Sequence, residues 1–240
     1  MPTVIPESLA DQIISAKIRE WELKRKEEKA RKTRKAIETY PFLTISRDFG
    51  CGEDEIIPKL EKKLGWKVYG RNLLDHLAQR ETLSRNFMET LDEQKESQVD
   101  NWVNYLIRSG AMLQDDYVIK ISKMIKVLVS QESCIILGRG ANYVLHDKQE
   151  GLNIKLTAPF ESRVQCIMEL RTLTEEKAKK LVKKTDAERA EFIGHYFNVN
   201  RKSRVSVPFD IIINTKNVSA DMICKTITMI LEEKKKALSL

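Results

Sequence analysis

Short apolar runs and longer helical patterns alternate along the chain from residue 42 onward. The apolar runs predict buried strands at residues 42–46, 66–69, 133–137, 153–157 and 210–214. Apolar residues at helical spacing predict helices at 54–64, 71–80, 98–108, 116–131, 141–146, 159–170, 174–184, 186–198 and 219–236. Strands that are apolar throughout are typical of a parallel sheet covered on both faces. The pattern therefore predicts a doubly wound α/β fold with five parallel strands, in which the less periodic region 82–115 is an insertion.

A separate pattern occupies the N-terminus, where residues 6–39 are predicted to form one long helix. One face of its first half carries apolar residues at helical spacing: Leu9, Ile13, Ile14, Ile18 and Trp21. In 24–35 all but one residue are polar, and mixed charges at this spacing indicate a solvated helix. We therefore divide the chain into a charged N-terminal helix at 1–40 and an α/β domain at 41–240. The apolar face requires a partner surface, either its own domain or a second subunit, so a homodimer through this helix is one hypothesis.

Composition and charge narrow the classes of function. The chain has 240 residues, of which 42% are hydrophobic and 32% charged, and its net charge is +7, which suits an anionic ligand. The four cysteines and three histidines are isolated from one another, so we expect no metal site built from them. No apolar run approaches the 18 residues of a membrane span, and we expect a cytoplasmic protein with reduced thiols. A contact between the basic N-terminal stretch and nucleic acid is an alternative that we do not favour.

The first candidate site is the turn that follows the first predicted strand. Ser46 ends that strand, Arg47 follows it, and Gly50, Cys51 and Gly52 lead into a helix. Glycines let backbone N–H groups approach an anion, and the start of a helix adds a positive dipole end. The sequence therefore predicts a phosphate-binding loop, although three acidic residues follow Gly52 and a purely structural turn is the alternative.

The second candidate is an arginine at the end of the strand at 133–137. Arg139 stands between Gly138 and Gly140, where ligands of open α/β sheets bind. Its guanidinium offers five donors in a fork that matches a phosphate. The alternative is an arginine that caps a helix or pairs with an acid.

The third candidate lies on the helices that follow the fourth predicted strand. Arg163 is placed one turn into the first of them, and Asp186 and Arg189 share a face of a later one. A surface ion pair is the simple interpretation. If these residues converge, they predict a closing lid that neutralises a transferring phosphoryl group.

These motifs, taken in order, resemble the cytidylate kinase-like proteins, P-loop-fold relatives of the nucleoside monophosphate kinases. The stretches that carry the resemblance are LTISRDFGCG at 43–52, LGWKVYGRNLL at 64–74, GRGAN at 138–142, LTAP at 156–159 and FDIIIN at 209–214, together with Arg163, Asp186 and Arg189. The resemblance spans roughly residues 42–232. It implies a three-layer P-loop NTPase-like fold, a helical acceptor-side insertion at 82–115 and a lid-like region at 171–205.

The resemblance also implies a reaction and roles for the residues. The implied activity is transfer of phosphate from ATP to a nucleoside monophosphate such as CMP, with Mg²⁺ bridging the ATP phosphates. Residues 46–52 would face those phosphates, and Arg71 and Arg139 would hold the phosphate of the acceptor. The residues expected to act in catalysis are Arg139, Arg163, Asp186 and Arg189.

The loop departs from the pattern of its relatives, which usually reads Gly-Ser-Gly-Gly-Arg-Glu. Here it reads Gly-Cys-Gly-Glu-Asp-Glu at 50–55, without the lysine and the hydroxyl residue of a standard phosphate loop. Two alternatives to a kinase therefore stay open. One is a catalytically degenerate member that binds a nucleotide or phosphorylated ligand, and the other is a protein-interaction module that uses its N-terminal helix.

Overall fold

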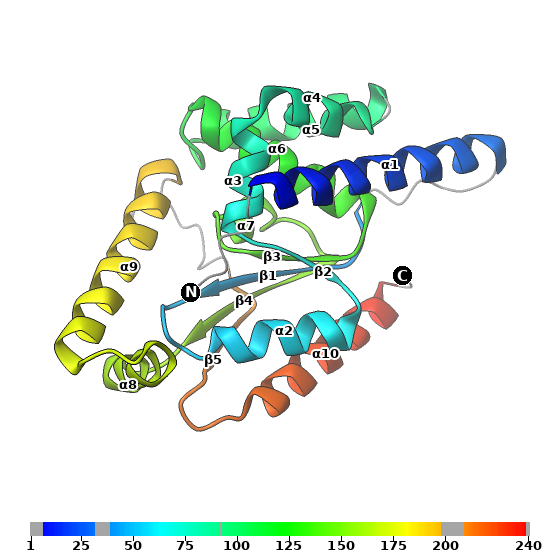
Figure 1. The fold of residues 1–240 in the computed structure, drawn as a ribbon. Coiled ribbons are helices and arrows are strands. Elements are labelled where there is room, and N and C mark those ends of the chain that lie inside the picture. The colour runs from blue at the N-terminus through cyan, green and yellow to red at the C-terminus, as the bar shows by residue number, and fades with distance from the viewer. Residues whose placement is uncertain (1–6, 32–38, 92, 198–208, 239–240) are drawn as a thin grey trace.

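The computed structural model describes residues 7–31, 39–91, 93–197 and 209–238, and its centre is one sheet of five parallel strands (Figure 1). The strands are β1 (Phe42–Arg47), β2 (Lys67–Tyr69), β3 (Cys134–Leu137), β4 (Gly151–Thr157) and β5 (Ile211–Asn214). Their order across the sheet is β2-β3-β1-β4-β5. In the middle strand, Leu43 is in register with Ile135 of β3 and Leu152 of β4. The predicted five-stranded parallel sheet is confirmed, and all five strands end at the same edge.

Helices cover both faces of the sheet, which gives the three layers visible in Figure 1. One layer contains α1 (Glu7–Arg31), α3 (Arg71–Gln79), α4 (Glu81–Glu89), α5 (Glu93–Arg108), α6 (Asp116–Gln131) and α7 (Ala141–Val144). The other layer contains α2 (Glu53–Leu64) and α10 (Ala220–Ala237). The remaining two helices, α8 (Phe160–Arg171) and α9 (Glu175–Tyr196), lie beyond the carboxyl ends of the strands (Figure 1).

The alternation of side chains along β1 divides the core between the two faces. Phe42 and Ile136 belong to the apolar cluster under α3 and α6, whereas Leu43 and Ile45 pack with α2 and α10. A third, smaller cluster joins Phe49 to α8 and α9. The loop after β1 is thus part of a packed unit with these two helices.

Helix α1 packs on its own domain. Its buried residues are Ala10, Ile14, Ile18 and Trp21. Trp21 meets Phe87 of α4 edge-on, with ring centroids 5.0 Å apart, and Lys17 Nζ lies 2.6 Å from the carboxylate of Glu132 at the end of α6. The apolar face is therefore covered within the chain, which removes the reason for expecting a homodimer through this helix. The predicted continuation to residue 39 is wrong, because Thr39 lies in a bend, while 32–38 fall outside the described residues.

Two details of the helices differ from the pattern-based prediction. Within 82–115 the pattern predicts one helix at 98–108, whereas the structure has most of α4 and the longer helix α5 there. Among the described side chains of α4 only Phe87 is fully buried, so its apolar signal is weak. The helices predicted at 174–184 and 186–198 form the single helix α9, since no glycine or proline stands at their junction. No helix in the described ranges is long and apolar enough to cross a membrane.

Candidate active site

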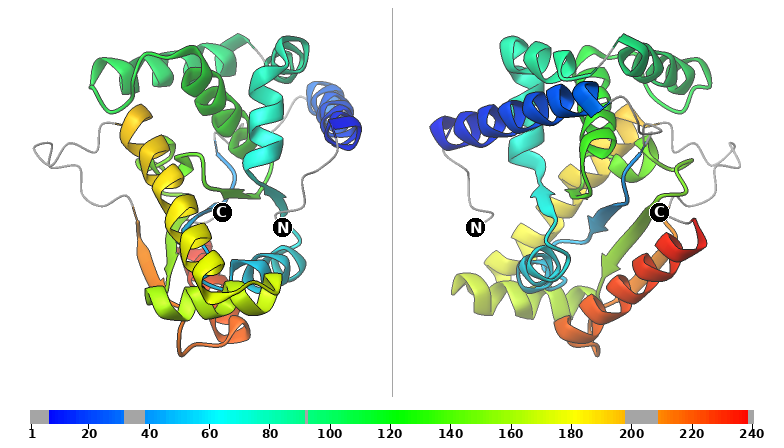
Figure 2. Two further views of the ribbon diagram at one scale, coloured as in Figure 1. Left: turned by 60° about the vertical axis from the view of Figure 1, so that its left-hand side comes forward. Right: turned by 90° about the vertical axis from the view of Figure 1, so that its right-hand side faces the viewer.

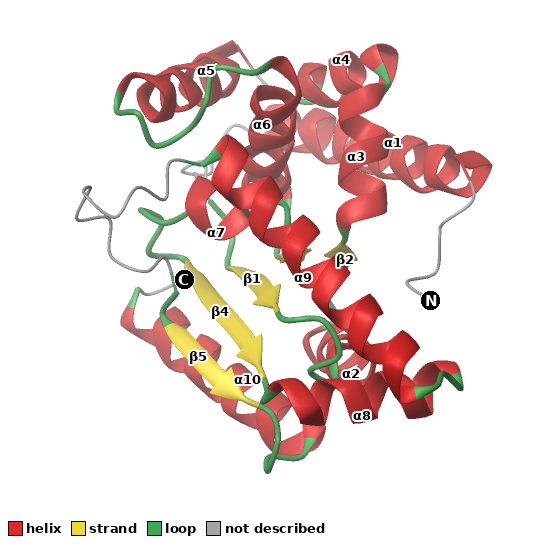
Figure 3. Ribbon diagram, turned by 90° about the vertical axis from the view of Figure 1, so that its left-hand side faces the viewer, coloured by secondary structure: helices red, strands yellow, loops and turns green. Residues whose placement is uncertain are grey.

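The loop after β1 lies at the carboxyl edge of the sheet, and α9 runs across that edge (Figure 3). Gly50 and Gly52 both have positive φ angles, 83° and 84°, which glycine adopts without strain. A Cβ on Gly50 would lie 2.8 Å from the backbone oxygen of Arg163, so only glycine allows α8 to approach this closely. Gly52 is the N-cap of α2, and because it has no side chain it offers no cap to the first N–H groups of the helix, a position that suits an anion.

The loop already contains a buried negative charge. Glu53, the first residue of α2, is 7% exposed, and its Oε1 lies 3.6 Å from Nη2 of Arg189. The thiol of Cys51 donates to its Oε2 at 3.6 Å. Burial, reinforced by the Glu53 charge, raises the pKa of the Cys51 thiol, so this sulfur stays protonated at neutral pH. Glu53 thus places a carboxylate beside the loop in which the sequence predicts phosphates.

Arg47 places a half-buried positive charge between the two glycine turns. Its Nη1 lies 2.9 Å from the position that a Cβ on Gly138 would occupy, so the side chain reaches from β1 to the turn after β3. Its buried Nε has no hydrogen-bond partner in the structure. Burial, and to a smaller extent the like charge of Arg189, lowers the pKa of Arg47 to about 10, which leaves the group charged at neutral pH. A charged donor without a partner is suited to an anion that enters this space.

Helices α8 and α9 are tied to the glycine loop by three side chains. The carboxylate of Asp186 accepts a hydrogen bond from the backbone N–H of Phe49 at 2.8 Å and another from Arg163 at 2.5 Å. Arg163 also donates to the backbone oxygen of Phe49 at 3.2 Å, and Arg189 donates to that of Arg47 at 2.8 Å. The three residues predicted for the lid are therefore brought together at the loop, where they hold its backbone in place.

Arg139 forms a second cluster with an acid that the sequence analysis did not select. Its φ is 51°, a left-handed conformation that costs a non-glycine residue about 1–2 kcal/mol. The guanidinium makes a bidentate pair with Asp75, in which Nε donates to Oδ1 at 2.7 Å, and it lies 4.4 Å from the ring centre of Phe192. The hydroxyl of Tyr117 donates to the same carboxylate at 2.7 Å. Arg139 is thus paired with an acid, the alternative left open by the sequence.

Asp75 also connects the two arginines predicted to hold an acceptor. Nε of Arg71 lies 3.6 Å from its Oδ2, and the side chain of Arg71 is 63% exposed. The sequence carried one signal for Asp75, its position four residues after Arg71 on a predicted helix. Asp48 was also missed; it accepts a hydrogen bond from Thr157 at 2.5 Å and lies 3.3 Å from Nζ of Lys155.

The site has no preformed metal centre among the described residues, where no three His, Cys, Asp or Glu side chains converge. The uncapped start of α2 and the unpartnered Nε of Arg47 fit nucleotide phosphates. Glu53 opposes them.

Comparison with known proteins gives the following relationships. Residues 42–217 match the family described as the cytidylate kinase-like family. The solved structure of an uncharacterized protein from Eubacterium ventriosum is 22% identical, with a TM-score of 0.60, over 80% of this chain and 98% of that one. Shikimate kinase from Acinetobacter baumannii is 15% identical, with a TM-score of 0.42, over 82% of this chain and 96% of that one. None of the curated proteins matches the chain.

Proposed function

The chain belongs to the cytidylate kinase-like family, and on that basis we propose that it is a nucleotide-binding phosphotransferase that transfers a phosphoryl group from ATP to a nucleoside monophosphate such as CMP. The observation that carries the proposal is the convergence of cations on one glycine loop. Arg47 from β1, Arg163 from α8 and Arg189 from α9 all contact or border residues 47–52. Phosphoryl transfer depends mainly on positioning and on positive charge around the phosphates.

On the donor side, the proposal assigns the ATP phosphates to the glycine loop. Ser46, Gly50, Cys51 and Gly52 would line it, and the first N–H groups of α2 would donate to the phosphate oxygens. Arg47 would take the place of the missing loop lysine, because its buried Nε has no hydrogen-bond partner at this position. Bound Mg²⁺ would neutralise part of the charge on the transferring group.

On the acceptor side, Arg71 and Arg139 would hold the phosphate of the nucleoside monophosphate. Arg139 has its fork on Asp75, so Asp75 would act as a positioning residue that fixes the guanidinium between Tyr117 and Phe192. An oxygen of the acceptor phosphate would then attack the γ-phosphorus as the bond to ADP breaks. We also propose that 171–205 acts as the lid and 82–115 as the acceptor-side insertion.

Arg163, Asp186 and Arg189 would act through the loop in this proposal. Their hydrogen bonds to the backbone of Phe49 and Arg47 fix the loop geometry. Rotation of α8 and α9 toward the nucleotide would turn the two guanidinium groups from backbone oxygens to phosphate oxygens, for which charge-assisted hydrogen bonds are stronger.

The second candidate function is that of a fold member that binds a nucleotide or phosphorylated ligand without catalysis. The observation that favours it is Glu53, whose buried carboxylate lies 3.6 Å from Arg189 and pairs with the positive charge that a phosphate would otherwise bind. A carboxylate at this place repels ATP, while a ligand with fewer charges is affected less.

Two measurements separate these functions. A coupled assay for ADP release, run with CMP, dCMP and UMP as acceptors, is expected to show turnover with at least one of them. If the correctly folded protein gives no turnover but calorimetry detects ATP or CMP, the non-catalytic function replaces the kinase. If neither nucleotide binds at millimolar concentration, both proposals fail.

A further inference from the structure

The second half of α9 presents a face of aromatic and polar side chains. Residues at three- and four-residue spacing share one side of a helix, and five of them line a cavity of about 330 Å³: Glu188, Glu191, Phe192, His195 and Tyr196. Phe192 also contacts the guanidinium of Arg139, whose Cζ lies 4.4 Å from the ring centre. The cavity therefore adjoins the arginine proposed to hold the acceptor phosphate.

The aromatic residues form a wall of this cavity. The rings of Phe192 and Tyr196 have their centres 4.9 Å apart. Tyr117 of α6 packs against both, with its ring centre 6.4 Å from the first and 5.8 Å from the second. The imidazole of His195 stands edge-on to Tyr196, with ring centres 4.6 Å apart. Nucleic-acid bases stack on aromatic side chains, so this wall suits the flat ring of a base.

Contacts at the end of α9 hold the wall in place relative to Arg139. The backbone N–H of Leu113 donates to the backbone oxygen of Tyr196 at 2.8 Å. The next residue, Phe197, stacks on Tyr143 of α7 with ring centres 5.2 Å apart. Figure 2 shows this end of α9 beside the layer that contains α6 and α7. The cavity is thus formed before a ligand enters, as sites for small molecules usually are.

Two polar side chains of the lining have no partner. In the part of the chain that the structure describes, neither the carboxylate of Glu191 nor the imidazole nitrogens of His195 form a hydrogen bond or an ion pair. Glu188, by contrast, lies 3.9 Å from Nζ of Lys184. Glu191 and His195 are four residues apart and are therefore neighbours on the helix surface. A carboxylate only accepts hydrogen bonds and an imidazole carries an N–H, so the lining offers an acceptor next to a donor.

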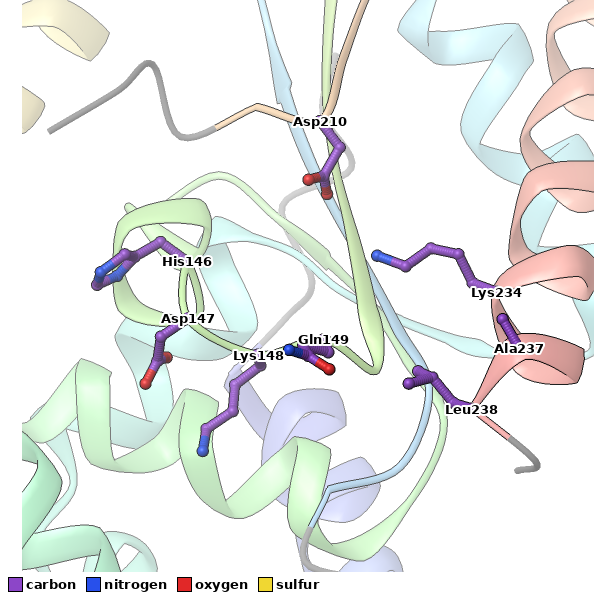
Figure 4. Close-up of a pocket in the computed structure, with 8 residues that line it drawn as sticks. All are labelled: His146, Asp147, Lys148, Gln149, Asp210, Lys234, Ala237 and Leu238. Atoms are coloured by element: carbon purple, nitrogen blue, oxygen red, sulfur yellow. The ribbon is translucent and has the colours of Figure 1, made fainter.

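Another cavity, of about 380 Å³, lies between the connection after α7 and the last turns of α10 (Figure 4). Among the described residues, its lining includes no Phe, Tyr or Trp. Two of its charged side chains are already engaged, since Lys234 donates to the backbone oxygen of Gly151 and Asp210 accepts from the N–H of Asn153. This cavity lacks the ring surface that the cavity along α9 provides.

We propose that the cavity along α9 binds the base of the acceptor nucleotide and selects a base with an exocyclic amino group. This inference rests on the function proposed above, in which Arg139 holds the acceptor phosphate. Phe192 and Tyr196 would stack on the base, whichever base it is. Glu191 and His195 would read its hydrogen-bonding edge.

The edge of the base decides which nucleotides fit. Cytosine and adenine carry an amino group next to a ring nitrogen that accepts a hydrogen bond. The amino group would donate to Glu191, as the amino group of cytosine does to acidic side chains, and His195 would donate to the ring nitrogen. Uracil and guanine place a carbonyl oxygen where the amino group stands, and the carboxylate of Glu191 repels that oxygen.

The test is isothermal titration calorimetry of the full chain with CMP, UMP, AMP and GMP in the absence of ATP. The Kd for UMP is expected to exceed that for CMP roughly tenfold or more, and the Kd for GMP to exceed that for AMP likewise. All four nucleotides have the same phosphate, so binding through Arg139 alone would give equal values.

Three variants make the result specific to the edge of the base. Glu191→Gln is expected to bring the ratio of the UMP and CMP constants to within about threefold of one, because an amide both donates and accepts. Phe192→Leu is expected to weaken CMP and UMP about fivefold or more and to leave their ratio unchanged. Glu232→Gln removes the same charge from an exposed position on α10 and is expected to change neither constant.

The outcomes separate this inference from the proposed function. Equal constants for CMP and UMP in the unchanged chain, or the same ratio in Glu191→Gln as in the unchanged chain, would overturn the inference. The kinase proposal would survive either result, because turnover tests it separately. If none of the four nucleotides binds at millimolar concentration, the inference and the acceptor role of Arg139 are both overturned.

Discussion

Replacement of Glu53 by Gln isolates the effect of the negative charge in the glycine loop. Glutamine keeps the size of the side chain and can still accept a hydrogen bond from the Cys51 thiol, but it removes the charge opposite Arg189. We predict that Glu53→Gln binds ATP more tightly than the natural sequence does. Arg189 then interacts with the phosphates without competition from a carboxylate.

The distances give the size of the expected effect. With an effective dielectric constant of about 20, two unit charges 3.6 Å apart, as Glu53 and Arg189 are, interact by about 4–5 kcal/mol. Arg189 is 29% exposed, so solvent screening reduces the gain that ATP realises to about 1.4–2.8 kcal/mol. This corresponds to a 10- to 100-fold lower Kd for ATP. Loss of the pair also lowers the free energy of unfolding, by about 1–2 kcal/mol.

Isothermal titration calorimetry with ATP and Mg²⁺ measures this directly, and urea unfolding measures the stability. Glu55→Gln is the matched control, because Glu55 lies in the same turn of α2, is exposed and pairs with Lys59. It is expected to change the Kd for ATP less than threefold. Weaker ATP binding in Glu53→Gln, or an equal gain in Glu55→Gln, would refute the reasoning that Glu53 opposes the phosphates.

The remaining predictions concern the acceptor cluster, the link between α9 and the loop, and a buried lysine. Arg139→Lys loses the bidentate pair and is expected to raise KM for the acceptor at least tenfold with little change in KM for ATP. Tyr117→Phe is expected to change KM for the acceptor less. Steady-state kinetics measure both constants, and a change in KM for ATP alone would contradict the assignment of Arg139 to the acceptor. Asp186→Asn weakens the hydrogen bonds to the Phe49 N–H and to Arg163 and is expected to lower the free energy of unfolding, measured in urea, by about 1–3 kcal/mol. Glu188→Gln, at an exposed position of the same helix, is expected to change that free energy by no more than about 0.5 kcal/mol. Equal effects of the two variants would contradict the role of Asp186 in joining α9 to the loop. Lys126 of α6 is 8% exposed and lies over the ring of Trp102, 5.2 Å from its centre. Burial lowers its pKa from 10.5 to about 7, so its cost to stability is complete below pH 7 and disappears as pH rises toward 10.5. Lys126→Met is therefore expected to raise Tm more at pH 6 than at pH 9, and an equal rise at both values would contradict the lowered pKa.

The sheet could be predicted from the sequence because its strands are continuous apolar runs. Runs such as the one ending at Ile45 are buried on both faces, and burial of this kind leaves a local signal. The ends of the helices were harder to predict from the sequence. No glycine or proline stands near Thr185, so the local pattern permits one helix as well as two, and α9 continues through this position while it packs against Phe49 of the loop.

The sequence was enough to predict which residues belong to the site, but not which of them form hydrogen bonds or ion pairs with one another. The sequence singled out Arg139, but its pairing with Asp75 joins residues 64 positions apart, which no spacing rule connects. The same holds for Asp186, which caps the N–H of Phe49 from 137 positions away. The direction of Arg47 also required the structure, because it depends on how β1 and β3 are paired.

The central claim is phosphoryl transfer between nucleotides, and ³¹P NMR of the full chain with ATP, Mg²⁺ and CMP tests it most directly. The account predicts that the γ-phosphate signal of ATP declines while signals of ADP and CDP grow at equal rates, and that Arg139→Lys slows both. A spectrum in which ATP is unchanged, or in which inorganic phosphate grows without CDP, would contradict the claim.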